Sequence, residues 1–299
     1  MFLLQEAGPG IHAAIAPRVG GPAISNAAIV DLGDKTIVVD SFMTIAAADE
    51  LRETARALTG RDVLLVVSTH FHRDHVGGNS AFADLPIVST RVTLDLMAAD
   101  SAADAAAYGA EIDATLAAAR SAVEQADSAE AAAAAADLLA MAEAMDATRD
   151  RYRLTLPDLL IGDRLVIEGS ERSAEIVSPG RGHTASDVFV HVADAGVVVA
   201  GDLVWEGTHP KLDDGHPSDW AGSVDTLAGC SPRAVVPGHG PVAGAASLEH
   251  MAAYLRAVDG MVAAARSGDL DPADAPAPAG SEAWGGIERL RRGIAALAS

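Results

Sequence analysis

The sequence predicts an α/β fold in which two β-sheets pack face to face and helices cover their outer faces. Three patterns predict this arrangement. Short β-branched segments recur in both halves of the chain, helical patterns follow the strands in each half, and an alanine-rich stretch separates the halves. Of the 299 residues, 49% are hydrophobic and 4% aromatic, so we expect a core of mainly Ala, Val and Leu. The length allows one large domain or two small ones, and we expect a single domain spanning residues 1–299.

The first ninety residues alternate between strand and helix patterns. Short β-branched runs at 11–17, 25–32 and 35–42 predict three strands in a meander. Residues 45–60 have helical spacing and end at Gly60, a residue suited to the position after a helix. The remaining predicted elements of this half are a buried strand at 62–70, a short helix at about 76–83 and a strand at 85–90.

Residues 91–157 form the alanine-rich stretch and contain almost no β-branched residues. Ala and Glu favour helix, so this stretch predicts two or three helices with a break near Asp127 and Ser128. We interpret it as an insertion that forms a helical hairpin against the main body. Two roles remain open for it: a structural or homodimer-forming hairpin, and a lid over the active site.

Strand patterns resume in the second half, at 163–169, 172–180, 187–196, 197–205 and 233–240. A helix is predicted at 217–230, with Ser218 as its N-cap and Asp219 in its first turn. Helices from about residue 245 to 299 complete the chain, interrupted by a Pro- and Gly-rich loop at 268–286.

The charge balance restricts the class of partner. The chain carries 42 acidic and 21 basic residues, a formal net charge of −21. Sequence-independent binding to nucleic acid or to anionic membranes needs a basic surface, so we expect neither. The single cysteine, Cys230, excludes an intrachain disulfide and a cysteine-based zinc cluster. The first residues lack a basic region, and no apolar window is long enough to span a membrane. We therefore expect a cytoplasmic protein that acts on a small molecule.

Polar residues follow four of the predicted strands, each on a glycine-containing turn. The stretch "STHFHRDHVGGN" (68–79) follows the first of these strands, and His183, Asp202 and His239 follow or end the others. Glycine lets the backbone turn sharply, so that a side chain can point inward at the edge of a sheet. Core packing does not require four such positions, and imidazole and carboxylate groups together predict a metal site.

These motifs resemble those of the metallo-β-lactamase-fold hydrolase superfamily. The resemblance covers about residues 10–245 and rests on four motifs: His70-x-His72-x-Asp74-His75, Gly182-His183-Thr184, Gly201-Asp202 and Gly238-His239-Gly240. It implies an αββα sandwich with a dinuclear metal site at the edge where the two sheets meet.

The resemblance also implies a role for each residue. His70, His72 and His183 would bind one metal ion, Asp74, His75 and His239 the other, and Asp202 would bridge both. Two Zn²⁺ ions suit these ligands best, with Fe or Mn as alternatives. A hydroxide held between two ions would be the nucleophile, oriented by Asp74. Asp40 and Asp187 are candidate acceptors for the outer ring nitrogens of the histidines, and each has the alternative role of a turn or cap aspartate.

Asp202 discriminates among the reactions of this superfamily. Zinc β-lactamases of the commonest type have Cys at this point, whereas Asp resembles glyoxalase-type thioesterases and phosphodiesterases. We therefore expect hydrolysis of an ester, thioester, lactone or amide-type bond. The alternatives are β-lactamase or phosphodiesterase activity, an iron-dependent persulfide dioxygenase, and a non-catalytic metal-binding scaffold.

Three residues beyond Asp202 are candidates for the substrate pocket: Trp205, His209 and Lys211. Lys211 lies roughly where hydroxyacylglutathione hydrolases keep a basic residue for the substrate carboxylate. The alternative roles are packing against a sheet edge for Trp205 and a solvated loop position for His209 and Lys211.

Overall fold

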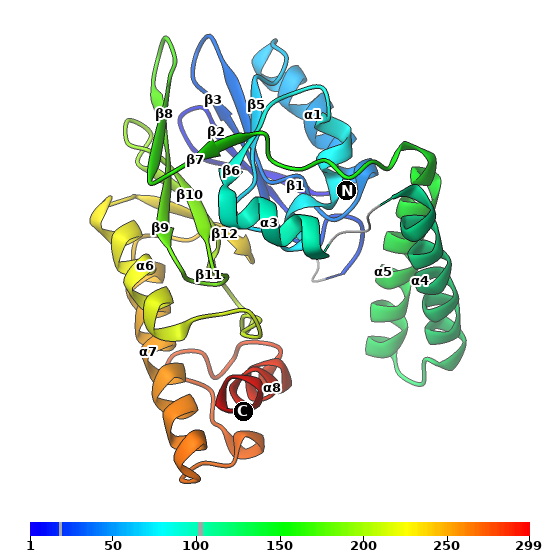
Figure 1. Cartoon of the computed structure of the whole chain (residues 1–299), viewed down its shortest axis with the longest axis vertical. Coiled ribbons are helices and arrows are strands. Elements are labelled where there is room, and N and C mark those ends of the chain that lie inside the picture. Colours follow the sequence, from blue (N-terminus) through cyan, green and yellow to red (C-terminus); the bar gives the residue numbers. More distant parts are fainter. Residues whose placement is uncertain (18–19, 101–103) are drawn as a thin grey trace.

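The computed structural model describes residues 1–17, 20–100 and 104–299, and its core is two β-sheets that face each other (Figure 1). The first sheet has seven strands in the order β1-β2-β3-β4-β5-β6-β7. Their bounds are β1 Leu3–Gly8, β2 Ile11–Ile15, β3 Ala27–Asp31, β4 Thr36–Val39, β5 Leu65–Val67, β6 Ile87–Thr90 and β7 Leu159–Ile161. Strands β1 to β4 pair antiparallel, and β4 to β7 pair parallel.

The second sheet has five strands in the order β12-β11-β10-β9-β8. Their bounds are β8 Arg164–Glu168, β9 Ser173–Gly180, β10 Asp187–Val192, β11 Val197–Trp205 and β12 Ala234–His239. Only the β11–β12 pair is parallel. Apolar side chains from the inner faces of both sheets form one buried cluster, with Val30 and Val67 from the first sheet and Val190 and Val199 from the second.

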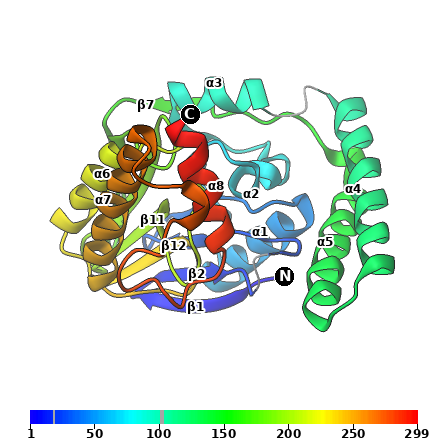
Figure 2. The ribbon, with the colours of Figure 1, turned by 90° about the horizontal axis from the view of Figure 1, so that it is seen from below.

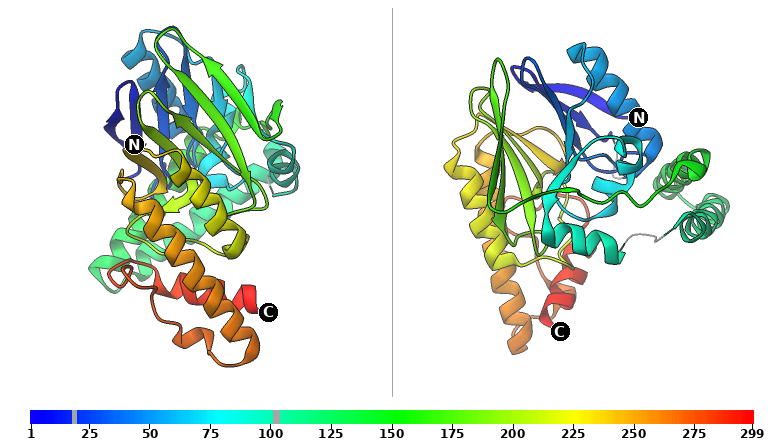
Figure 3. Two further views of the ribbon diagram at one scale, coloured as in Figure 1. Left: turned by 90° about the vertical axis from the view of Figure 1, so that its left-hand side faces the viewer. Right: turned by 45° about the horizontal axis from the view of Figure 1, so that its top comes forward.

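Helices cover both outer faces (Figure 3, right). Helix α1 (Ile45–Thr59) packs on the first sheet. Helices α6 (Pro217–Gly229), α7 (Ala246–Ser267) and α8 (Ile287–Ala298) share a buried cluster with the second sheet. The predicted αββα sandwich is therefore confirmed. None of the helices in the described part of the chain is long and apolar enough to cross a membrane.

The alanine-rich insertion forms three helices, α3 (Arg91–Asp100), α4 (Ala105–Gln125) and α5 (Ala129–Ala147). Residues 101–103, which the prediction included, lie outside the described residues. The break near Ser128 is confirmed, because the Ser128 hydroxyl caps α5 by accepting from the Ala131 N–H at 3.1 Å. Helices α4 and α5 form a hairpin on the α1 side of the molecule, whereas α8 lies below the sheets (Figures 1 and 2).

Most predicted elements are present, with three differences. The sequence patterns did not predict β1 or β7, which are the two edge strands of the first sheet. The predicted short helix at 76–83 is α2 (Arg73–Val76) followed by a 3-10 helix, Gly77–Phe82. Helix α6 has His216 as its N-cap residue and Pro217 as its first residue, so Ser218 is not the N-cap, although Asp219 lies in the first turn as predicted. Short 3-10 helices at Arg149–Arg151 and Pro272–Asp274 complete the described elements.

Candidate metal centre

All seven predicted ligand residues converge at one edge of the sandwich. The 68–75 segment follows β5, His183 lies in the turn before β10, Asp202 lies within β11, and His239 ends β12. Strand β11 is irregular around Gly201, which has a φ of 54°, and Thr69 packs against the position of its missing side chain. Glycine at 201 therefore allows the 68–75 segment of one sheet to approach the Asp202 strand of the other.

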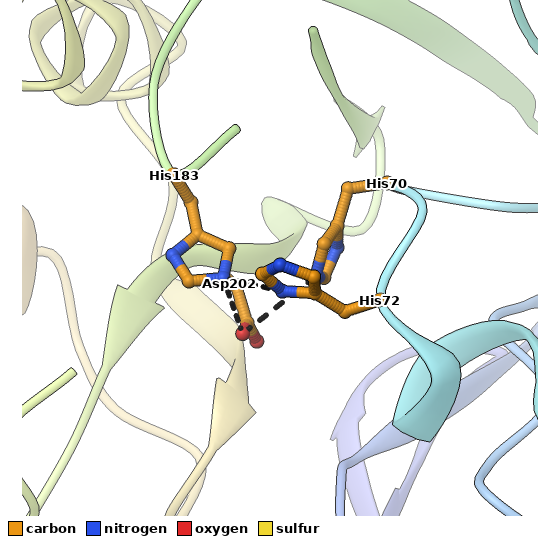
Figure 4. Close-up of side chains that lie close together, drawn as sticks. All are labelled: His70, His72, His183 and Asp202. Carbon is orange, nitrogen blue, oxygen red and sulfur yellow. Dashed lines mark hydrogen bonds and ion pairs between the residues drawn. The ribbon is translucent and has the colours of Figure 1, made fainter. Parts of the chain in front are cut away.

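The first group of residues is His70, His72 and His183, gathered around Asp202 (Figure 4). One ligand atom from each of these four residues lies within 4.8 Å of the others. Asp202 Oδ2 is 3.1 Å from His183 Nε2 and 3.7 Å from His70 Nε2. His183 Nε2 is also 2.9 Å from His72 Nδ1. All four residues are buried.

The second group is Asp74, His75 and His239, whose ligand atoms also lie within 4.8 Å of one another. It faces the other oxygen of the same carboxylate. Asp202 Oδ1 is 3.0 Å from His75 Nε2 and 3.5 Å from His239 Nε2. Asp74 Oδ2 is 3.2 Å from His239 Nε2 and 3.7 Å from His75 Nε2. The two oxygens of Asp202 therefore face two separate groups.

Asp40 orders the outer nitrogens of two histidines. Its Oδ2 is 2.8 Å from His75 Nδ1 and accepts from the Thr69 hydroxyl at 2.8 Å, and its Oδ1 accepts from the Thr69 N–H at 2.8 Å. Because the Thr69 hydroxyl donates to Asp40, its oxygen is free to accept from His70 Nδ1 at 3.0 Å. The Nδ1 atoms of His70 and His75 thus carry their protons outward, and their Nε2 atoms face the centre.

Asp214 has the same effect on His72. Its Oδ2 is 2.9 Å from His72 Nε2, so the protonated nitrogen of His72 points outward and its Nδ1 lone pair faces His183. Lys211 Nζ lies 3.4 Å from the same Asp214 oxygen. Neither Thr69 nor Asp214 was predicted from the sequence. Asp214 is 142 residues from His72 along the chain and lies in an irregular segment without a motif.

The polar atoms that face the centre are left without partners. His70 Nε2, His75 Nε2, His239 Nε2 and Asp202 Oδ1 are buried and form no hydrogen bond within the described residues. Such atoms are costly to bury unless something satisfies them. Imidazole lone pairs and carboxylate oxygens directed at a common point are the donor set of a divalent transition metal such as zinc. The residues present therefore fit a metal centre.

The pKa values follow from the same crowding. Burial lowers the pKa of His183 to about 4, and burial together with the charge of His75 holds the pKa of His70 well below its usual value. Burial also opposes protonation of His75 and His239. The nearby carboxylates outweigh it, raising the pKa of His75 well above its usual value and that of His239 to about 8. Without a metal, the carboxylates therefore draw protons onto the second group.

Within the described part of the chain, Asp187 forms no hydrogen bond or ion pair with a histidine ring. Its Oδ2 accepts from the Thr184 N–H at 3.0 Å and its Oδ1 from the Thr184 hydroxyl at 3.1 Å, whereas His183 Nδ1 has no hydrogen-bond partner among the described residues. Burial raises the pKa of Asp187 to about 7. The expectation that Asp187 would accept a hydrogen bond from the His183 ring is therefore wrong. Asp187 has its alternative role, that of a turn aspartate, and orders the turn that carries His183.

Each of the three candidate pocket residues contacts another side chain of the protein, and a role for them in substrate binding stays a prediction. The Trp205 ring stacks on His239, with ring centres 3.9 Å apart and 5% of the residue exposed. His209 is buried, and its Nδ1 is 2.9 Å from the Tyr254 hydroxyl. Lys211 pairs with Asp214, as described above, and with Asp213. A pocket of about 320 Å³ adjoins His239, and residues 206–208 are among those that line it. Trp205, His209 and Lys211 do not line this pocket.

Comparison with known proteins agrees with this architecture. The family model described as "Metallo-beta-lactamase superfamily" matches residues 20–239, which include all seven ligand candidates. Among solved structures, the chain is similar to a metallo-beta-lactamase from Pontibacter korlensis, with 18% identity and a TM-score of 0.61, over 86% of this chain and 99% of that chain.

Two further structures give the same result. A metallo-beta-lactamase from Hirschia baltica matches with 18% identity and a TM-score of 0.59, over 85% of this chain and 97% of that one. The DIM-1 metallo-beta-lactamase matches with 18% identity and a TM-score of 0.57, over 86% of this chain and 97% of that chain. At these identities the similarity establishes the shared fold.

Proposed function

The chain belongs to the metallo-β-lactamase superfamily, and we propose that it is a dinuclear zinc hydrolase that cleaves an ester, thioester, lactone or amide-type bond of a small molecule. One observation carries the proposal. The carboxylate of Asp202 directs Oδ2 at His70 and His183 and Oδ1 at His75 and His239. A single buried carboxylate placed between two clusters of ligand atoms suits a bridge between two ions.

In this proposal His70, His72 and His183 hold one ion, Asp74, His75 and His239 hold the other, and Asp202 contacts both. Zn²⁺ is the proposed metal because neutral imidazoles dominate both groups, with Fe and Mn as the alternatives where carboxylates contribute. When bound, two such ions supply Lewis acidity and a hydroxide nucleophile at neutral pH.

Asp74 is the proposed catalytic residue. Its side chain is 24% exposed, compared with 2% for Asp202 and 5% for His239, so of the two candidate ligand carboxylates it is the one that solvent reaches. The positive charge of His75 and His239 outweighs its burial and lowers its pKa well below the usual range. Asp74 therefore stays ionised and can accept a hydrogen bond from an incoming water molecule, which fixes the direction of attack.

The bridging position also guides the choice of substrate. Because Asp202 stands where the commonest zinc β-lactamases have Cys, we propose acyl-type hydrolysis ahead of β-lactam hydrolysis. The lactamases named above share the fold at 18% identity, which does not determine the substrate.

A substrate panel tests the proposal. Zinc-loaded protein is assayed on lactones, thioesters, aryl esters, β-lactams and phosphodiesters, beside chelator-treated protein and the Asp74→Asn variant. We expect turnover of at least one acyl substrate that chelation abolishes, and a loss of about 10²-fold or more in Asp74→Asn, which keeps its circular-dichroism spectrum. Near-normal rates in Asp74→Asn would exclude its role. Zinc binding without turnover of any panel member would favour the scaffold alternative.

A further inference from the structure

The C-terminal helix α8 brings an arginine to the metal centre. In Figure 2, which views the molecule from below, this helix lies on the near side, next to the labels of β11 and β12, the strands that carry Asp202 and His239. The Arg289 guanidinium carbon lies 5.7 Å from the centre of the Trp205 ring, and that ring stacks on His239. Arg289 is therefore separated from a candidate ligand by a single aromatic side chain.

A chain of hydrogen bonds holds Arg289 in place. Its Nη1 donates to the His209 carbonyl at 3.0 Å. The His209 N–H donates to the Gly285 carbonyl at 2.8 Å, and its ring bonds the buried Tyr254 hydroxyl. Stacking of a guanidinium near an indole adds further stabilisation. The side chain is thus positioned in advance, and the remaining N–H groups of its planar fork form no hydrogen bond within the described residues, so they can bind another group.

Arg289 has no acidic partner in the described part of the chain, although acidic residues outnumber basic ones by 42 to 21. Its neighbour on the same helix, Arg291, pairs with Glu288, and the predicted carboxylate-binding residue, Lys211, pairs with Asp213 and Asp214. Burial and the charge of Arg292 lower the pKa of Arg289, while Asp202 and Asp74 attract its charge. A partly buried cation near the centre therefore remains without a counter-charge of its own.

We propose that Arg289 binds an anionic group, a carboxylate or a phosphate, on the substrate of the metal centre. A guanidinium fork recognises such groups with two parallel hydrogen bonds. The inference rests on the proposed function and makes it more specific: the substrate is an acyl compound that carries an anion, and α8 is the element that selects it. Arg289 is a specificity-determining residue in this proposal and takes no part in bond cleavage.

Paired substrates test the inference. A hydrolysable ester with a terminal carboxylate is compared with the same ester bearing a neutral carboxamide in place of the carboxylate. A third ester carries a phosphonate at that position. For Arg289→Gln we expect the KM of the anionic esters to rise by about tenfold or more, from the loss of a charged hydrogen bond. The kcat of this variant for the anionic esters, and its kcat and KM for the carboxamide ester, should change by less than about threefold. Arg291→Gln removes the same charge from the same helix and should leave all the constants unchanged.

A binding measurement separates this inference from the proposed function. Succinate is titrated calorimetrically into zinc-loaded wild-type protein, Arg289→Gln and Arg291→Gln, and we expect weaker binding in Arg289→Gln alone. If no ester is cleaved but this difference holds, the anion site stands and the proposed hydrolysis fails. If esters are cleaved and Arg289→Gln affects charged and neutral substrates equally, Arg289 only secures α8 and the inference is wrong.

Discussion

At the scale of single residues, the histidine nitrogens that face away from the centre determine what the inner ones can do. Asp40 accepts, directly or through Thr69, the protons of His75 and His70, and Asp214 accepts that of His72. Each ring is held in orientation, with its outer nitrogen protonated, before a metal binds. These outer contacts are therefore part of the metal centre, although none of the three residues would touch the ions.

Asp40→Asn tests this positioning. Asn has the same shape and tolerates the left-handed backbone of this position, where φ is 62°. Its amide cannot accept at both former oxygens, so a bond to Thr69 or to His75 is lost. We expect zinc affinity to fall by about 10- to 100-fold, measured by competition with a chromogenic chelator. Asp84→Asn, which removes a partner of Arg52 on the surface, serves as the control. Equal affinity in both variants would contradict the role of Asp40.

The sequence alone identified the seven ligand candidates because each stands on a glycine-containing turn at a strand end or within β11. Asp40, which follows β4, was found because it too stands at the end of a predicted strand, although no glycine lies beside it. Asp214 and Arg289 carry no such signal, since they reach the centre from an irregular segment and from a helix distant in sequence. Their placement depends on how β11, α7 and α8 pack, which a local pattern does not encode.

At the scale of elements, prediction failed at the two edge strands of the first sheet, whereas the edge strands of the second sheet, β8 and β12, were predicted. Strand β1 has exposed residues at four of its six positions, and β7 has only three residues. Each is stabilised by a single neighbouring strand, β2 and β6 respectively. A short edge strand has little hydrophobic patterning of its own, because one side and one face meet solvent. The buried strands have β-branched runs and were predicted within a few residues.

The alanine-rich helices are a second feature at this scale. Tyr108, Ile112, Met141 and Met145 form a buried cluster between α4 and α5 that is separate from the cores of the sandwich. Arg73, next to the candidate ligand Asp74, forms an ion pair with Glu111 of α4. The hairpin therefore contacts the segment that carries the ligands from the side of α1. Whether it forms a dimer remains a prediction.

The close packing of β11 against β12 gives a prediction for Gly238. A methyl group added there would overlap Asp202 Oδ1 and lie 2.8 Å from the Asp202 nitrogen. We expect Gly238→Ala to destabilise the fold by about 1–3 kcal/mol in urea unfolding and to lower the zinc content. Gly222→Ala, in α6 with open space around it, should be neutral or stabilising by up to about 1 kcal/mol. Similar behaviour of the two variants would contradict the packing described.

At the scale of the whole molecule, the candidate metal centre takes its residues from both sheets. Residues 68–75 follow a strand of the first sheet, whereas His183, Asp202 and His239 belong to the second. At least four carboxylates of the described residues, those of Asp40, Asp74, Asp202 and Asp214, meet there in a chain of net charge −21. Bound cations would offset this concentration of negative charge and hold the sheets together at that edge.

Metal removal should therefore lower the stability of the whole fold. A ligand present at 1,000 times its Kd stabilises the native state by about 4 kcal/mol. We expect chelator-treated protein to unfold at a Tm lower by several degrees in differential scanning calorimetry, and added zinc to restore it. Magnesium, which prefers oxygen ligands, serves as the control and should not restore it. An unchanged Tm after verified zinc removal would show that the centre does not link the sheets.

The number of metal ions per chain tests the central claim most directly. Protein purified without chelator is exchanged into metal-free buffer, and its metal content is measured by inductively coupled plasma mass spectrometry against the protein concentration. Because Asp202 lies between two complete groups of ligand atoms, we expect about two zinc ions per chain. A content at or below one ion per chain, or iron alone with uptake of dioxygen, would contradict the dinuclear hydrolase.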